Sequence, residues 1–199
     1  MTRLETWLRQ PVDNSALIFF RIAYGFLVFL QAAGSIVLGF TRRTFVEAQY
    51  TFPMVGFEFL RPLFGPEMYA VFALMSVAAL LVMVGAWYRL SLTVFTVLWA
   101  LTYVMQTESY NNHYYLMVLL CLLLLPTPAN AWASVDARRH PEIRSTVCPR
   151  WCIAQFVLQS LIVYTYASYA KLYPDWLDGR AITTILTNRE KFDTIAWLY

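Results

Sequence analysis

Five long apolar runs constrain this chain more than any other feature of its sequence. Roughly 20 mostly apolar helical residues cross a hydrocarbon core about 30 Å thick. The runs cover residues 17–40, 68–87, 90–106, 113–125 and 151–170. We therefore predict an all-α fold, a polytopic helical bundle in the membrane with about five transmembrane helices. The connection Tyr88-Arg89 is so short that the second and third helices should be antiparallel neighbours.

The composition agrees with a membrane protein and excludes several other classes. Hydrophobic residues make up 59% of the chain and charged residues 14%, whereas soluble domains carry about 25% charged residues. This balance excludes a disordered chain and an ordinary cytosolic enzyme. The net charge of +3 is too small to indicate a polyanionic partner, so no nucleic acid is expected.

The loop arginines and lysines predict the orientation in the membrane. The side of the membrane that receives the N-terminus holds seven loop arginines and lysines, and the other side holds six. Four of the seven, Arg138, Arg139, Arg144 and Arg150, share one loop. Positive loops stay preferentially in the cytoplasm, so we predict a multi-pass protein with a cytoplasmic N-terminus. The turn before His113 and the end of the fifth span then lie on the extracytoplasmic side.

The domain organisation follows from the last run. Residues 1–176 are predicted to form one transmembrane domain, and 177–199 an interfacial amphipathic tail with apolar residues among charges. The sequence stops on the apolar residues 196–199. Two alternatives therefore stay open for the tail, a complete end or the start of a missing C-terminal half.

The three cysteines are interpreted as structural. Cys148 and Cys152 form a C-x-x-x-C pair, but two ligands do not make a zinc site. The predicted topology places both on the cytoplasmic side, where thiols stay reduced, and Cys121 lies among leucines. We expect no metal.

Arg21 and the tyrosines near the span ends each allow two interpretations. Arg21 either snorkels from a shallow depth or faces the bundle interior and pairs with a carboxylate or a polar headgroup. Most of the tyrosines fit an aromatic belt at the headgroup level, whereas a minority could line a pocket for a flat aromatic ligand.

The fifth span carries a polar stripe. Ser160, Tyr164, Ser168 and Lys171 fall within one sector of about 80° on a helix. Such a stripe should face the bundle or a water-filled cavity rather than lipid. Lys171 either snorkels at the helix end or is an amine in a low-dielectric pocket, where desolvation favours the neutral form and permits general-base chemistry.

His113 opens the fourth span behind Asn111 and Asn112. Asparagine is a good N-cap, so these two residues have a structural use, whereas the imidazole has none so obvious. On the predicted topology His113 and Lys171 lie at the same depth on the same side. Together they suggest a membrane-embedded acid–base site that opens outward.

Several short motifs carry a family resemblance over nearly the whole chain. They are Phe20-Arg21 with Tyr24-Gly25-Phe26, Leu60-Arg61-Pro62-Leu63, Gly85 to Ser91, Tyr110-Asn111-Asn112-His113, Ser134-Val135-Asp136, and Lys171-Leu172 with Asp175-Trp176. With these motifs the sequence resembles the vitamin K-dependent γ-glutamyl carboxylase family and its bacterial relatives, the horizontally transferred transmembrane (HTTM) proteins. One of the family's paired lysines is Ala170 here.

The resemblance implies an enzyme of the carbon–carbon lyase type. The lysine matching Lys171 would deprotonate reduced vitamin K or another quinol as cofactor, and the product with O2 would remove the γ-proton of a glutamate. The carbanion would then attack CO2, with the histidine matching His113 linked to this half. Asn111 and Asn112 would shape the site, and Arg21, Tyr164 and Ser168 are further candidates for binding.

The implied partners are a glutamate-containing exported peptide or protein and the lipid bilayer, with the active site facing the extracytoplasmic side. Two alternatives stay open. The chain could be a non-carboxylating HTTM protein for maturation of, or immunity to, a secreted peptide. It could also be a non-catalytic membrane subunit.

Overall fold

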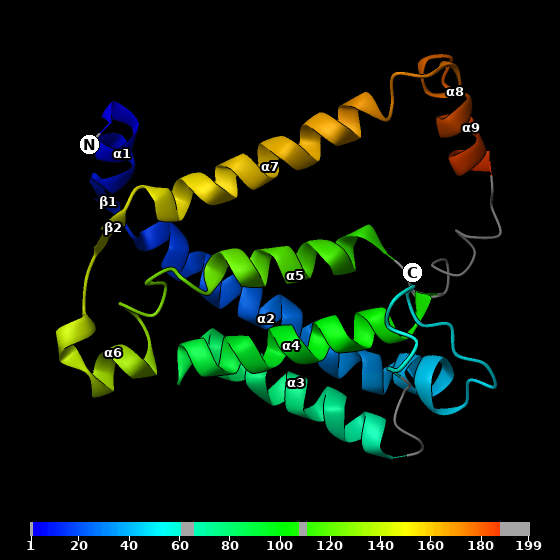
Figure 1. Ribbon diagram of the computed structural model, residues 1–199, viewed down its shortest axis with the longest axis horizontal. Coiled ribbons are helices and arrows are strands. Elements are labelled where there is room, and N and C mark those ends of the chain that lie inside the picture. The colour runs from blue at the N-terminus through cyan, green and yellow to red at the C-terminus, as the bar shows by residue number, and fades with distance from the viewer. Residues whose placement is uncertain (1, 61–65, 108–110, 188–199) are drawn as a thin grey trace. The chain divides into compact units, whose positions relative to one another are not determined.

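The computed structural model describes residues 2–60, 66–107 and 111–187, and nearly all of its regular structure is helical (Figure 1). The chain divides into two compact units, residues 1–154 and 155–199. The first contains α1 (Arg3–Arg9), β1 (Pro11–Asp13), α2 (Ser15–Val37), η1 (Arg42–Val46), α3 (Glu67–Val84), α4 (Tyr88–Met105), α5 (Asn112–Leu124), α6 (Val135–Arg139), η3 (Pro141–Ile143) and β2 (Val147–Pro149). α7 (Trp151–Tyr169) begins there and runs into the second unit, which adds α8 (Pro174–Leu177) and α9 (Arg180–Thr187).

The predicted all-α membrane bundle is confirmed. α2, α3 and α4, with 23, 18 and 18 residues, are long and apolar enough to cross a membrane. α5 has 13 residues, or about 20 Å at 1.5 Å per residue, which is short of the hydrocarbon core. α7, with 19 residues, is long enough to cross a membrane. It contains glutamines, serines and tyrosines, however, and is less apolar than the three candidate spans α2, α3 and α4.

The core of the first unit lies where α2, α3, α4 and α5 pack in sequence order, each against the next (Figure 1). Gly25 brings α2 unusually close to α3, because a Cβ atom there would lie 2.7 Å from the backbone of Met83. Phe72, Met75, Phe95 and Leu92 fill the interior between α3 and α4 with almost no exposed surface. Close backbone approach at a glycine is typical of helix contacts in membranes.

The turn between α3 and α4 falls earlier than expected. α3 ends at Val84 because Gly85 adopts the left-handed conformation, φ 67°, and Ala86 N–H donates to the Leu81 carbonyl at 2.9 Å. Tyr88 and Arg89, predicted as the connection, are the first residues of α4. The antiparallel arrangement of these two helices is as predicted.

A short sheet ties the start of the chain to the segment before α7. β1 and β2 are antiparallel, with Val12 opposite Cys148, and Asn14 N–H donates to the Thr146 carbonyl at 2.8 Å. Asn14 also donates from Nδ2 to the Pro128 carbonyl at 3.0 Å. These two hydrogen bonds hold the loop between α5 and β2 against the start of α2.

Within the predicted tail, α9 is helical, and the interfacial position of the tail stays a prediction. Residues 188–199, the Arg61 motif at 61–63 and Tyr110 lie outside the described residues. The proposed division at residue 176 stays a prediction.

Candidate functional site

Asn111 holds His113 in a defined orientation at the start of α5. The Asn111 Oδ1 atom accepts the His113 backbone N–H at 2.8 Å, which confirms the predicted N-cap, and lies 2.7 Å from His113 Nδ1. A backbone N–H can only donate, so the amide atom facing it is the oxygen. The ring nitrogen that shares this oxygen must then be a donor. Nε2 of the exposed imidazole makes no bond to Asn111 and is the acceptor whenever the ring is neutral.

The residue after His113 is locked in an aromatic cluster. The rings of Tyr114 and Trp99 meet edge to face with centroids 5.3 Å apart, and Trp99 Nε1–H donates to the Tyr114 carbonyl at 3.3 Å. Gln31 of α2 donates to the Tyr114 hydroxyl at 3.3 Å. The start of α5 is therefore fixed to both α2 and α4, which makes the His113 backbone a rigid platform.

An aromatic cleft lies beside this cluster. It encloses about 20 Å³ and is lined by Phe40, Phe45, Phe72, Trp99, Thr102, Tyr103 and Tyr114. Two of the tyrosines near the span ends, Tyr103 and Tyr114, thus line the same cleft. The lining suits a planar ring, but the enclosed space is that of a single water molecule. A ring would enter only with widening of the cleft.

Lys171 follows the end of α7 in the second unit. Its backbone N–H donates to the Ser168 carbonyl at 3.1 Å, and its Nζ atom lies 5.2 Å from the centre of the Trp176 ring. Pro174 begins α8 three residues later, so the chain turns directly after the lysine. The family motif at Lys171 and Trp176 is therefore a real contact between an exposed amine and a half-buried indole.

Ser160, Tyr164 and Ser168 lie on α7 before the lysine, as expected. All three side chains are exposed. That they face a bundle or a cavity, and that Lys171 lies near His113, stay predictions.

Arg21 is completely buried and is bound by backbone carbonyls. Nε donates to Ala129 at 3.0 Å, Nη1 to Val82 at 3.0 Å and to Met83 at 2.5 Å, and Nη2 to Ala133 at 2.7 Å. Val82 and Met83 belong to the last turn of α3, whose carbonyls lack partners within the helix. The snorkelling interpretation is wrong, because the guanidinium is held inside the protein. These contacts give Arg21 a structural role, and its binding of a ligand stays a prediction.

Asp136 connects the same loop to α4. Its carboxylate accepts the N–H groups of Trp87 and Tyr88 at 2.8 and 2.9 Å and the Asn130 side-chain amide at 3.0 Å. A carboxylate at a helix N-terminus also complements the helix dipole. Three family motifs, at Arg21, Gly85–Ser91 and Ser134–Asp136, thus form one structural junction, which the sequence interpretation had not brought together.

Gly85 has no alternative at this junction. Besides its positive φ, a Cβ atom there would lie 2.4 Å from Ser134 Cβ and 2.8 Å from Arg21 Nη1. The conformation and the space both exclude a side chain.

The three cysteines are buried, and none of them forms a disulfide. Burial raises the pKa of the Cys148 thiol, so it is mostly protonated and unreactive near neutral pH. Cys121 contacts the Tyr24 hydroxyl at 3.4 Å, and Tyr24 donates to the Met117 carbonyl at 2.7 Å, which joins α2 to α5. Among the described residues no group of three or more potential metal ligands occurs.

α2, α3 and α4, each long and apolar enough to cross a membrane, define a helical membrane protein. Residues 9–199 match the model of the HTTM domain, so the chain belongs to the HTTM family. This domain is found in vitamin K-dependent carboxylase-related proteins. No solved structure matches the chain.

Proposed function

We propose that this HTTM protein carries out a quinol-coupled modification of glutamate side chains in exported peptides, of the γ-carboxylation type. Membership of the family supports this, because its domain is found in carboxylase-related proteins. The observation that carries the proposal is the hydrogen bond between Asn111 Oδ1 and His113 Nδ1 at 2.7 Å. It presents a basic nitrogen, Nε2, from a rigid turn.

The residues around Lys171 suit a quinol. An acidic aromatic alcohol needs a base for its hydroxyl proton and a flat surface for its ring. The exposed Lys171 amine supplies the first and Trp176, 5.2 Å away, supplies the second. Oxidation of a bound quinol by O2 would supply the free energy and the strong base for removal of the weakly acidic γ-proton. Lys171 Nζ accepts a proton and becomes an ammonium group, and Ser168 and Tyr164 offer hydroxyl groups on the same helix.

His113 acts in the second half of the proposed reaction. Its Nε2 atom accepts a proton or a hydrogen bond close to the carbon that gains CO2. Asn111 keeps Nδ1 protonated, so the ring does not exchange the roles of its two nitrogens. This division gives Lys171 and His113 separate steps that can be measured separately.

The test uses membranes that contain the full chain, incubated with a reduced quinone, labelled bicarbonate and a glutamate-rich peptide. We expect label in the peptide together with quinone epoxide. In the variant His113→Ala quinol oxidation should continue while carboxylation is lost. A histidine with only a structural role would lower both activities and the protein yield together.

If membranes that contain well-folded protein give neither labelled peptide nor quinone epoxide, the proposal is contradicted. Peptide binding without either product would instead favour a maturation or immunity protein, and restoration of activity by a second protein would favour a non-catalytic subunit. Ala170, where the family has a second lysine, makes Ala170→Lys an informative addition. If the single amine limits the rate, this variant should increase quinol oxidation.

A further inference from the structure

The end of the first unit opposite His113 carries an excess of unpaired positive charge. We call it the arginine-rich end, formed by Arg3, Arg9, Arg89, Arg138, Arg139, Arg144 and Arg150. In the described part of the chain, none of these arginines forms an ion pair. Arg139 and Arg150 lie over the rings of Trp87 and Trp7, 5.1 and 4.8 Å from the ring centres. Among the described residues, no acidic side chain neutralises the other arginines of this end, which leaves their charge to a partner.

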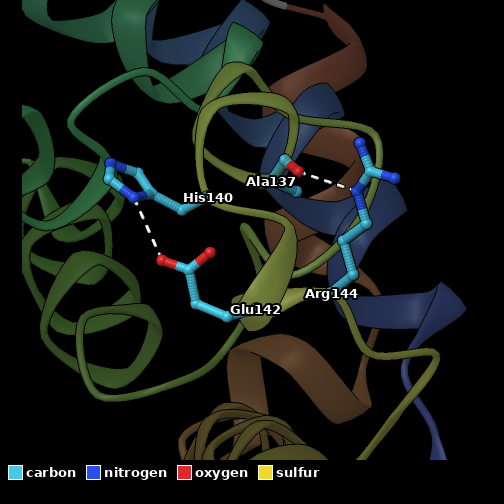
Figure 2. Close-up of polar contacts among 4 residues, drawn as sticks. All are labelled: Ala137, His140, Glu142 and Arg144. Carbon is cyan, nitrogen blue, oxygen red and sulfur yellow. Dashed lines mark hydrogen bonds and ion pairs between the residues drawn. The ribbon is translucent and has the colours of Figure 1, made fainter.

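The acidic side chains at this end are already occupied. The Glu5 carboxylate accepts the backbone N–H of Thr2, and the Asp13 carboxylate accepts that of Ser15. Asp136 caps α4, and Glu142 contacts His140 Nδ1 at 3.1 Å (Figure 2). None of the four carboxylates is within ion-pair distance of an arginine at this end, so the positive surface is not neutralised from within.

Two of the arginines line one hollow. It measures about 290 Å³, and its walls are Trp132, Ala133, Ser134, Ala137, Arg138 and Arg144. Arg144 is held in place, because its Nε–H donates to the Ala137 carbonyl at 2.8 Å (Figure 2). Its two terminal nitrogens point away from this bond, and no hydrogen bond to them is found within the described ranges. A fixed guanidinium with free terminal N–H groups is a preorganised receptor for a phosphate.

The position of the hollow indicates which kind of molecule would carry the phosphate. It lies in the loop that Arg21 and Asp136 fasten to the ends of α2, α3 and α4, the three helices able to cross a membrane. Trp132 and Trp87 beside the loop are 48% and 58% exposed, and exposed tryptophans favour the headgroup level. A phosphate at this depth belongs to a lipid.

We propose that the arginine-rich end binds the headgroup of an anionic phospholipid, with Arg138 and Arg144 in contact with the phosphate and Trp132 at the acyl boundary. Loops rich in arginine mark the cytoplasmic side, where the leaflet is anionic. The binding would anchor the loop between α5 and α7 to that leaflet. This proposal is independent of the chemistry at Lys171 and His113.

The test measures lipid retained by the purified full chain in a non-ionic detergent, by native mass spectrometry. Phosphatidylglycerol and phosphatidylcholine with identical acyl chains are titrated in parallel. We expect the chain to retain phosphatidylglycerol preferentially. The variants Arg138→Gln and Arg144→Gln should each weaken this binding about fivefold, the effect of one arginine near an anionic surface.

The matched control is Arg43→Gln at the opposite end. Arg43 also donates one hydrogen bond to a backbone carbonyl, that of Leu38 at 3.2 Å, so it mirrors Arg144 in charge and contact. It should leave phosphatidylglycerol binding unchanged. Arg138 has no side-chain hydrogen bond among the described residues, so Arg138→Gln keeps the test valid if Arg144→Gln fails to fold.

Three results would overturn the proposal. The first is equal retention of the two lipids. The second is an equal loss in the Arg43→Gln control, which would indicate a general charge effect. The third is displacement of phosphatidylglycerol by inorganic phosphate at the same concentration, because the site would then recognise a free anion and not a lipid.

Discussion

Asn111 Oδ1 lies 2.7 Å from His113 Nδ1 and 2.8 Å from the His113 backbone nitrogen, so one amide oxygen caps α5 and orients the imidazole. The two tasks can be separated by substitution. Asn111→Asp keeps a capping oxygen, since aspartate and asparagine cap helices about equally well. The new carboxylate, however, favours the doubly protonated ring, in which Nε2 no longer accepts a proton.

We therefore expect Asn111→Asp to fold with unchanged stability but to lose about tenfold in carboxylation at neutral pH. Carboxylation and thermal unfolding are measured on the same preparation. Unchanged carboxylation at neutral pH would show that the tautomer of His113 does not matter.

Arg21 should be essential for folding. Arg21→Met removes the side-chain donor to the carbonyls of Ala129, Val82, Met83 and Ala133. Val82 keeps the Gly85 N–H at 3.1 Å, whereas a buried carbonyl left without a donor costs about 1–3 kcal/mol. We expect a loss of several kcal/mol in the free energy of unfolding, seen as a strongly lowered melting temperature in detergent. Arg21→Lys keeps the charge but not the planar, five-donor guanidinium group. Its melting temperature should lie between those of the unchanged protein and of Arg21→Met. A stable Arg21→Met protein that fails only in ligand binding would instead favour the predicted binding role.

Asp136 should stabilise the turn between α3 and α4. Asp136→Ala leaves the N–H groups of Trp87 and Tyr88 without their acceptor, and the loss of a helix cap costs about 0.5–2 kcal/mol. The control is Glu142→Gln in the same loop, an exposed carboxylate whose side-chain partner is His140. The melting temperature should fall for Asp136→Ala and stay constant for Glu142→Gln. Equal shifts would mean that the loop charge matters and the cap does not.

The orientation in the membrane can be tested by labelling introduced cysteines. Val55 is 95% exposed in the loop after η1, and Arg138 is exposed at the arginine-rich end. Val55→Cys should react with a membrane-impermeant maleimide in intact cells, and Arg138→Cys only after permeabilisation. The three native cysteines are buried and give a low background. The reverse pattern would place His113 in the cytoplasm and contradict the outward-facing site.

The helices could be predicted because hydrophobic length is a local property of the sequence. The run 113–125 corresponds to α5 (Asn112–Leu124), and 151–170 to α7 (Trp151–Tyr169). The cap at Asn111 was likewise predictable, since its partner is two residues away. The pairing of β1 with β2 and the environment of Arg21 were not. Both depend on backbone groups more than fifty residues distant in the chain, and a backbone carbonyl leaves no signature in the sequence.

In the proposed reaction Lys171 acts as the base that takes the quinol proton. Lys171→Arg keeps the positive charge and a similar reach toward Trp176, but a guanidinium stays protonated at any working pH. The decisive measurement is the rate of quinol oxidation in membranes that contain the full chain or this variant at equal, well-folded levels. We predict a loss of about two to four orders of magnitude, the usual contribution of general acid–base catalysis, with partial recovery on addition of a small amine. Full quinol oxidation by the Lys171→Arg protein would contradict the claim, and the carboxylase mechanism with it.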